Sequence, residues 1–214
     1  MIRIVSLLAL IATPLAAQPV ATSPVIAPVE ALPPAPVPAT VRVSLVTSEG
    51  AIVLALEKER APVTTANFLR YVDGKRLDGA VFYRAMKLSD DPLYGLVQGG
   101  AENKPKRVLP PIAHEPTTLT GLTHTDGTIS MARGAPGTAS GDFFITVGDL
   151  VSLDAKSGQP GDDLGFAAFG HVVEGMDVVR KILFAPTSPT AGAEGMKGQM
   201  IVAPVTIVSA RRVN

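Results

Sequence analysis

The sequence predicts a mainly β fold, a closed antiparallel barrel capped by two α-helices, in one domain over residues 41–214. Glycine and proline are abundant, at 20 and 19 of 214 residues, which favours short strands and frequent turns. Strand-like segments open and close the domain, and only two segments have helical spacing. Strands at both ends with few helices favour a closed barrel over alternating strand–helix units.

The first 17 residues have the composition of a signal peptide. Arg3 precedes an apolar run over residues 4–12, and small residues follow at 14–17. The run is shorter than the roughly 20 apolar residues that a transmembrane helix needs. We therefore expect residues 1–17 to be cleaved and the mature protein to be periplasmic or secreted, without membrane contact. An uncleaved membrane anchor is the alternative.

Residues 18–40 are rich in proline and alanine and almost free of charge. Such a segment has no face that can pack into a core, and it favours the extended polyproline II conformation. We interpret it as a semi-rigid linker between the signal peptide and the folded domain.

The domain begins with a β-hairpin, because residues 41–46 and 52–56 are strand-like segments on either side of a turn at 48–50. A helix then starts at Pro62, which the first helical turn tolerates, and ends at 73–74. Helical spacing predicts that its buried stripe contains Val63, Ala66, Phe68 or Leu69, and Val72.

The remaining elements follow the same reasoning. A second helix is predicted over residues 174–183. In the pair Phe143–Phe144, strand alternation should point one ring into the barrel and the other outward. The remaining strands are predicted at residues 79–86, 95–100, 127–133, 142–147, 165–173 and 203–213.

Composition excludes several classes of function. The net charge is zero and the pI is near 6.8, which argues against nucleic-acid binding, since that needs a basic face. Cysteine is absent, and the three histidines are scattered along the chain, so we expect neither a metal site nor a cofactor.

The segment "FYRAMKLSDDPLYGLVQGG", which ends at Gly100, combines polar groups in an unusual way. Arg84 stands near its start and Gln98 near its end. Neither has a neighbouring histidine or carboxylate with which to perform acid–base chemistry. We read the intervening residues as an irregular loop.

Several segments, taken in order, resemble the cyclophilin family of peptidyl-prolyl cis–trans isomerases. They are "APVTTANFLRYV", "VFYRAM", "LVQGG", "GTISMARGAPGTASGDFFI", "SLD", "FAAFGHVVEGMDVV" and the last strand. The resemblance covers nearly the whole domain. It implies an eight-stranded barrel with a helix at each end, and a groove on its outer face for proline-containing polypeptides. We expect a monomer.

Prolyl isomerisation accounts for an arginine and a glutamine without an acid–base pair. The reaction breaks no covalent bond, and its barrier of about 18–20 kcal/mol comes from the partial double bond of the peptide. In the twisted amide the nitrogen lone pair becomes available, and a guanidinium donor near it stabilises this state. A side-chain amide can hold the substrate backbone. The catalyst therefore needs preorganised electrostatics and shape.

The resemblance assigns roles to nine residues. Arg84 matches the catalytic arginine and Gln98 the glutamine that holds the substrate backbone. Phe144 matches the aromatic residue of the proline pocket. The other substrate-binding positions are Leu96 and Leu153 beside that aromatic residue, Ala132 and Arg133 at the groove edge, and Asp142 and Phe166.

Four positions depart from the family pattern. Gly95 replaces an aromatic residue, Asp142 a glutamine, Ser152 a tryptophan and Phe166 a histidine. The loops over residues 87–95 and 154–165 are also longer and should lie at the rim of the groove. These departures motivate an alternative function, a proline-peptide-binding or chaperone module with weak or no isomerase activity.

Two further questions concern Asp142. As an anion it could pair with Arg84 or with Arg133, and we favour Arg84 because the resemblance places position 142 beside the arginine. It could also form a hydrolase triad with Ser130 and His124. We consider the triad improbable, because Ser130 lacks a nucleophile-elbow pattern and triads depend on geometry rather than presence. We expect His124 to anchor a turn.

Overall fold

The computed structural model describes residues 39–90, 93–102, 104–156 and 163–214. The expected signal peptide, and all but the last two residues of the expected linker, lie outside these ranges. In the described part of the chain, no helix is long and apolar enough to span a membrane.

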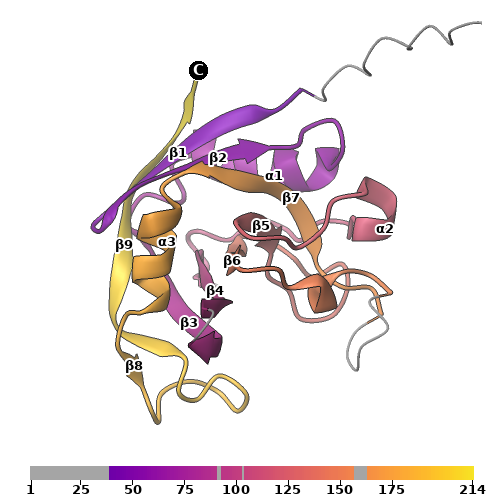
Figure 1. Ribbon diagram of the computed structural model, residues 1–214. Helices are drawn as coiled ribbons and strands as arrows, with labels where there is room; N and C mark the ends of the chain where they lie inside the picture. The colour runs from indigo at the N-terminus through magenta and orange to yellow at the C-terminus, as the bar shows by residue number, and fades with distance from the viewer. Residues whose placement is uncertain (1–38, 91–92, 103, 157–162) are drawn as a thin grey trace, which may run out of the picture. The chain divides into compact units, whose positions relative to one another are not determined.

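The folded domain is a closed antiparallel barrel, as predicted (Figure 1). Eight strands follow one another in the order β1-β2-β7-β5-β6-β4-β3-β9, and pairing of β1 with β9 closes the sheet. The two-residue strand β8 (Thr187–Ser188) extends the sheet beyond β9. The barrel strands are β1 (Val41–Thr47), β2 (Gly50–Leu56), β3 (Ala80–Asp90), β4 (Leu93–Gly100), β5 (Thr128–Met131), β6 (Asp142–Val147), β7 (Ala167–Glu174) and β9 (Met200–Val213).

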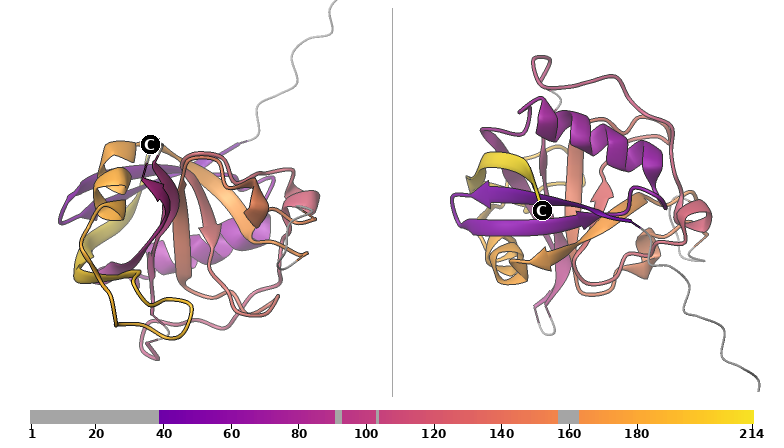
Figure 2. Two further views of the ribbon diagram at one scale, coloured as in Figure 1. Left: turned by 60° about the horizontal axis from the view of Figure 1, so that its bottom comes forward. Right: turned by 90° about the horizontal axis from the view of Figure 1, so that it is seen from above.

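Two helices cap the barrel, α1 (Pro62–Asp73) and α3 (Met176–Leu183). Figure 2 shows them on opposite sides of the barrel, where α1 packs on β7 and β9, and α3 packs on β2, β3, β4 and β6. The chain also forms a four-residue helix, α2 (Thr117–Thr120), and a 3₁₀ turn, η1 (Val151–Leu153), neither of which we predicted.

The predicted buried stripe of α1 is wrong at its start, since Val63 and Ala66 are exposed while Thr64 is buried. The reason is a polar contact. The Glu115 carboxylate accepts hydrogen bonds from the backbone N–H groups of Val63 (3.1 Å) and Thr64 (2.7 Å) and from the Thr64 hydroxyl (2.6 Å). This carboxylate satisfies the free N–H groups of the first turn and orients the helix.

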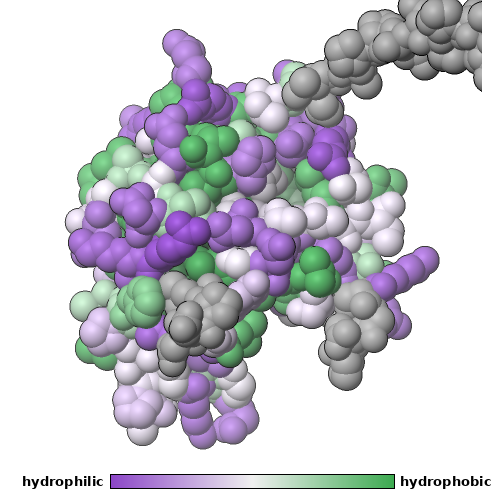
Figure 3. Space-filling view, viewed as in Figure 1, coloured by the Kyte–Doolittle hydropathy of each residue, from purple (hydrophilic) through white to green (hydrophobic). Residues whose placement is uncertain are grey.

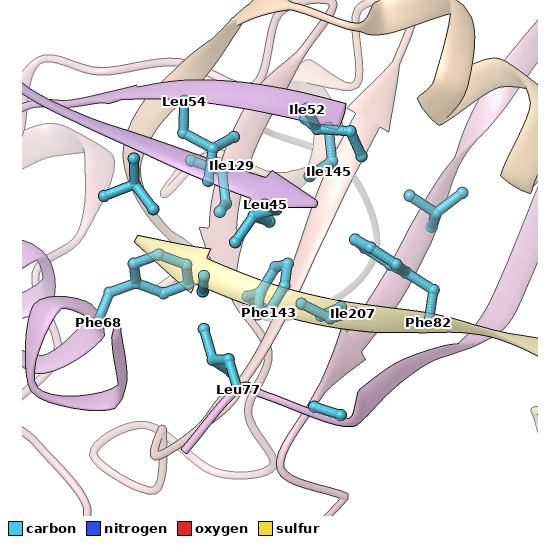
Figure 4. Packing of buried hydrophobic residues seen from close by; sticks show 14 of the residues in the cluster. Leu45, Ile52, Leu54, Phe68, Leu77, Phe82, Ile129, Phe143, Ile145 and Ile207 are labelled. Carbon is cyan, nitrogen blue, oxygen red and sulfur yellow. The ribbon is translucent and has the colours of Figure 1, made fainter. Parts of the chain in front are cut away.

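The interior of the barrel is filled by aromatic and aliphatic side chains (Figure 4). Phe143 lies at its centre and makes edge-to-face contacts with Phe68 and Phe82, with ring centroids 5.4 and 5.7 Å apart. All three rings are at most 2% exposed. A packed interior leaves no room for a substrate, so binding has to take place on the outside of the barrel.

The segment between Arg84 and Gln98 is not an irregular loop. The strands β3 and β4 continue through it as a hairpin, with Lys87 paired to Gly95 and Ser89 to Tyr94. Only residues 91–92, at the tip, lie outside the described ranges. A one-residue register shift between Lys87 and Ser89 accommodates the twist.

The distribution of hydrophobic and hydrophilic side chains over the surface does not by itself indicate a binding site. On the face seen in Figure 3, hydrophilic and hydrophobic side chains are interspersed rather than gathered into one large apolar area. Scattered apolar groups are normal on a soluble domain. The site is therefore identified from the side chains that line a groove.

Candidate functional site

A β-bulge places two consecutive side chains of β3 on the outer face of the barrel. Phe82 pairs with Gly99 and Arg84 with Gln98, so Tyr83 is an extra residue without a partner on β4. Phe82 points into the core and is fully buried, whereas Tyr83 and Arg84 are half-buried and line the same groove. Without the bulge, strand alternation would put Tyr83 and Arg84 on opposite faces.

The Arg84 guanidinium is held by three side chains. Its Nη1 donates to Oε1 of Gln98 (2.8 Å), its Nε to Oε1 of Gln199 (2.8 Å), and its Nη2 to the sulfur of Met86 (3.4 Å). All three acceptors are uncharged, so the positive charge is oriented but not neutralised by them. Partial burial lowers the pKa of Arg84, but an arginine stays protonated at any physiological pH.

Gln98 links the arginine to the bulged tyrosine. Its Oε1 accepts from Arg84, and its Nε2 donates to the Tyr83 hydroxyl (2.7 Å). Burial is the main cause that raises the pKa of Tyr83, so the phenol stays neutral and can accept this bond. Arg84, Gln98 and Tyr83 thus form one hydrogen-bonded unit.

This unit lines a groove of about 690 Å³. Six of the nine predicted site residues line it, namely Arg84, Gln98, Ala132, Arg133, Asp142 and Phe166. The structure adds seven lining residues that we did not predict: Tyr83, Glu102, Gly134, Thr138, Ser140, Met196 and Met200.

The other three predicted residues, Leu96, Phe144 and Leu153, lie next to the groove in what we call the outer apolar cluster. The cluster contains Leu96, Phe144 and Leu150, with Met86, Tyr94, Ala132, Leu153 and Phe166 packed against them. Its Phe144 ring is in edge-to-face contact with Phe166, at 5.4 Å between centroids. Phe143 and Phe144 therefore alternate as predicted, one in the core and one outside it.

The outer apolar cluster is largely covered by neighbouring side chains. Leu96 and Phe144 are only 5% and 3% exposed, so the Phe144 ring has little surface open to a ligand. Ala132 and Phe166 belong both to the cluster and to the groove lining, and they form the boundary between the two.

The preferred pairing of Asp142 with Arg84 is wrong, since the side chains that bind Arg84 are Gln98, Gln199 and Met86. Asp142 instead accepts a hydrogen bond from the backbone N–H of Glu102 (2.8 Å). Arg133 donates to the carbonyl oxygens of Gly134 (2.8 Å) and Gly165.

A family model described as "Cyclophilin type peptidyl-prolyl cis-trans isomerase/CLD" matches residues 42–212 of the chain. The chain belongs to this cyclophilin family. It is 36% identical over 174 residues to a peptidyl-prolyl cis-trans isomerase of Acinetobacter baylyi, covering 80% of this chain and 85% of that protein. It is 38% identical over 164 residues to peptidyl-prolyl cis-trans isomerase A of Dickeya dadantii, covering 75% and 80%.

Solved cyclophilin structures share the fold. A Cryptosporidium parvum cyclophilin, determined in the presence of the dipeptide Ala-Pro, superposes with a TM-score of 0.64. The match covers 81% of this chain and 99% of that one, at 19% sequence identity. It shows the barrel architecture at an identity too low to transfer individual residues.

Of the departures from the cyclophilin pattern, Gly95 has a structural explanation, and Ser152 can be located but is not explained. A side chain at Gly95 would collide with the Met86 carbonyl oxygen, at 2.2 Å from a Cβ, so an aromatic residue cannot stand there in this backbone. Tyr94 supplies an aromatic ring to the outer apolar cluster instead. Ser152 is exposed in the turn η1 and contributes nothing to that cluster.

The third departure, Phe166, contacts residues of both the outer apolar cluster and the groove. Its ring packs on Phe144, and the Arg133 guanidinium lies over it at 4.9 Å from the centroid, a cation–π contact. Of the expected rim loop 154–165, residues 157–162 lie outside the described ranges. Backbone hydrogen bonds close its two ends, from Lys156 to Asp163 and from Phe166 to Leu153.

Ser130 and His124 do meet, but with Asp154 rather than Asp142. Burial favours the neutral imidazole of His124. In the tautomer with its proton on Nδ1, that nitrogen donates to Oδ1 of Asp154 (2.5 Å), and Nε2 accepts from the Ser130 hydroxyl (2.9 Å). Burial is the main cause that lowers the pKa of His124. Ser130 and His124 are completely buried, so no substrate can reach the hydroxyl.

The hydrogen bonds among Ser130, His124 and Asp154 hold the His124 ring against the outer apolar cluster. The His124 ring stacks on Phe144, with centroids 5.9 Å apart and 16° between the planes. Our expectation that His124 anchors a turn is consistent with its backbone N–H, which also donates to Asp154. In the described residues, no group of three or more histidine or acidic side chains could hold a metal ion.

Sequence reasoning missed Tyr83 and Gln199 as site residues. Tyr83 reaches the groove only because of the bulge, and strand alternation argues against it. Gln199 is 115 residues from Arg84, in the loop before β9. Only the fold brings such distant residues together.

Proposed function

We propose that this protein is an exported peptidyl-prolyl cis–trans isomerase that accelerates rotation about Xaa-Pro bonds in folding client proteins. One observation carries the proposal. The Arg84 guanidinium lines a groove beside an apolar cluster and is held by neutral amide oxygens. The curated relatives described above bear the name of this activity.

The proline ring would bind at the boundary between the groove and the outer apolar cluster, near Ala132 and Phe166. The guanidinium has five N–H donors, and three of them have partners among the described residues. The remaining N–H groups on Nη1 and Nη2 are available to the amide nitrogen as it becomes pyramidal. The second N–H of the Gln98 amide can bind a carbonyl oxygen of the substrate backbone.

The energies are compatible with this division of roles. A 10⁴-fold acceleration requires about 5.5 kcal/mol of transition-state stabilisation. One charge-assisted hydrogen bond contributes about 1.5–3 kcal/mol. Arg84 alone is therefore insufficient, and the rest must come from the pocket, which holds the ring while the preceding carbonyl rotates.

One observation favours the second candidate, a proline-peptide-binding or chaperone module. Phe144 is 3% exposed beneath Phe166, so a proline ring must displace part of that cover to reach it. Such a displacement would weaken binding and slow turnover without abolishing recognition.

A protease-coupled assay on a short Ala-Xaa-Pro-Phe peptide, together with peptide titration by NMR, distinguishes the two candidates. We expect the wild-type protein to accelerate isomerisation and Arg84→Ala to lose most of the acceleration while still binding peptide. Peptide binding by the wild-type protein without acceleration would establish the binding module instead.

Export is a separate part of the proposal, supported by the composition of residues 1–17. Fractionation of cells that express the full chain, with mass spectrometry of its N-terminus, tests it. We expect a mature form that begins at Gln18 in the periplasm or medium. A full-length chain in the membrane fraction would contradict cleavage.

A further inference from the structure

Gln199 is the last residue of the loop between β8 and β9, which lies near the lower end of β3 in Figure 1. Its backbone is fixed on both sides. The carbonyl oxygen accepts from the N–H of Ala85 (2.8 Å), and the N–H donates to the carbonyl oxygen of Met196 (3.1 Å). Gln199 is thus attached to β3 directly after the catalytic candidate Arg84.

Its side-chain amide is fixed at both ends as well. Oε1 accepts from Nε of Arg84 (2.8 Å), and Nε2 donates to the carbonyl oxygen of Gly195 (3.3 Å). A guanidinium only donates and a carbonyl oxygen only accepts, so the two contacts agree on one orientation of the amide. The side chain therefore joins the arginine to the loop.

Gln199 and Gln98 hold different edges of the guanidinium, at Nε and at Nη1. Two contacts at different edges define the plane of the group, whereas one would leave it able to turn. Gln98 lines the groove and can exchange partners with a substrate, but Gln199 is not among the lining residues. Gln199 can keep its contact when a substrate binds.

We propose that Gln199 is a positioning residue for the isomerase reaction. Its neutral amide orients the Arg84 guanidinium through Nε and does not offset the positive charge of that group. This inference rests on the proposed function. A carboxylate at position 199 would also accept from Nε, but it would form an ion pair and offset the positive field that the twisted amide needs. The chemistry thus favours glutamine over glutamate at this position.

The test compares two substitutions with a control in the same loop. Gln199→Met keeps the length of the side chain and removes the acceptor, and Gln199→Glu keeps the acceptor and adds charge. Lys197→Met changes an exposed side chain of the loop and should leave turnover unchanged. We expect both Gln199 variants to lower kcat by about tenfold with KM within about twofold, the pattern of a contact that matters in the transition state.

A second readout reports on Arg84 itself. Its Nε–H signal in ¹H–¹⁵N spectra, assigned through its loss in Arg84→Lys, should exchange faster with water in Gln199→Met and stay protected in Gln199→Glu. If Gln199→Met disorders the loop, the kcat of Gln199→Glu provides the test, since that variant retains the hydrogen bond to Arg84.

Wild-type kcat in Gln199→Glu, or unchanged Nε–H exchange and kcat in Gln199→Met, would overturn the inference. Absence of turnover in the wild-type protein would refute the proposed function instead. The Nε–H measurement would still report whether Gln199 holds Arg84.

Discussion

The polar side of the site, around Arg84, and its apolar side, around Phe144, are held in place by different interactions. Arg84 is half-buried and depends on side-chain hydrogen bonds to residues from β4 and from the loop before β9. Phe144 is almost completely buried between Phe166 and the stacked His124 ring. The apolar side is therefore held mainly by packing, and the polar side mainly by hydrogen bonds between side chains. Substitutions should separate stability from activity accordingly.

The largest effect should come from Phe144→Ala on the apolar side. Removing a buried phenylalanine side chain costs about 3–5 kcal/mol of unfolding free energy, because it leaves a cavity. Urea denaturation followed by far-UV circular dichroism measures the loss. Val208→Ala, at an exposed position of β9, serves as the control and should change stability by less than about 0.5 kcal/mol. A loss below about 1 kcal/mol in Phe144→Ala would show that the outer apolar cluster does not support the fold.

On the polar side, Arg84→Lys should lower kcat/KM by about 100-fold, the lower range for removal of one transition-state donor. Lysine keeps the charge but lacks the planar group that binds Gln98 and Gln199 together. The melting temperature should stay within about 2 °C of the wild-type value, since less than about 1 kcal/mol of stability is at stake. Arg180→Lys, at an exposed ion pair with Asp126, is the matched control. Equal loss of stability and activity would contradict the separation of the two sides.

We expect the stability of the folded protein to depend on pH through the buried His124. Burial lowers the pKa of His124 below its usual value of about 6.5, so the unfolded chain binds more protons than the folded one in this range. The stability that neutral His124 contributes is complete above about pH 6.5 and is lost as the pH falls toward the folded-state pKa. We expect the melting temperature of the wild-type protein to fall more between pH 7 and pH 5.5 than that of His124→Gln.

Val208→Ala, which removes no titratable group and lies at an exposed position, provides the comparison for that measurement. Its melting temperature should depend on pH as that of the wild-type protein does. If the melting temperatures of His124→Gln and of the wild-type protein change equally with pH, the pKa of His124 does not differ between the folded and unfolded states.

The smallest effect should come from Asp142→Asn. Arg84 binds neutral amides and not Asp142, so removing the negative charge should change kcat/KM by less than about threefold, or roughly 0.7 kcal/mol. Asparagine keeps an oxygen that can accept from the Glu102 N–H. A tenfold rise in turnover would mean that Asp142 offsets the field of Arg84 after all.

In the strands, the sequence was sufficient where the two-residue period decides which face a side chain occupies, although the helical period failed at the start of α1. Alternation in β6 predicts that one of Phe143 and Phe144 points into the barrel and the other outward, and strand-like segments at both ends of the domain predict the closed barrel. The choice of Phe144 as the outer ring comes from the resemblance to cyclophilins. The sequence was insufficient where one residue breaks the period. The bulge at Tyr83 moves that side chain to the groove, and backbone hydrogen bonds, not side-chain pattern, determine where a bulge forms.

Contacts between residues far apart in the sequence could not be predicted either. Gln199 and Asp154 each carry a side chain that is common in loops, and neither has a sequence neighbour that marks its partner. The hydrolase triad that the sequence analysis argues against combines Ser130 and His124 with Asp142, because composition alone does not indicate which acid lies near the histidine. The acid that the fold brings to His124 is Asp154.

The closure of the barrel has a consequence for how the protein is made. Strand β9 follows all the other barrel strands in the sequence, and it pairs with both β1 and β3. Until it emerges from the ribosome or a translocation channel, β1 and β3 each have an edge that cannot be paired. Contacts between such distant segments form slowly, and open strand edges favour aggregation. The barrel therefore cannot close until β9 has been made, and the pairing that completes the fold is the last that these strands can form.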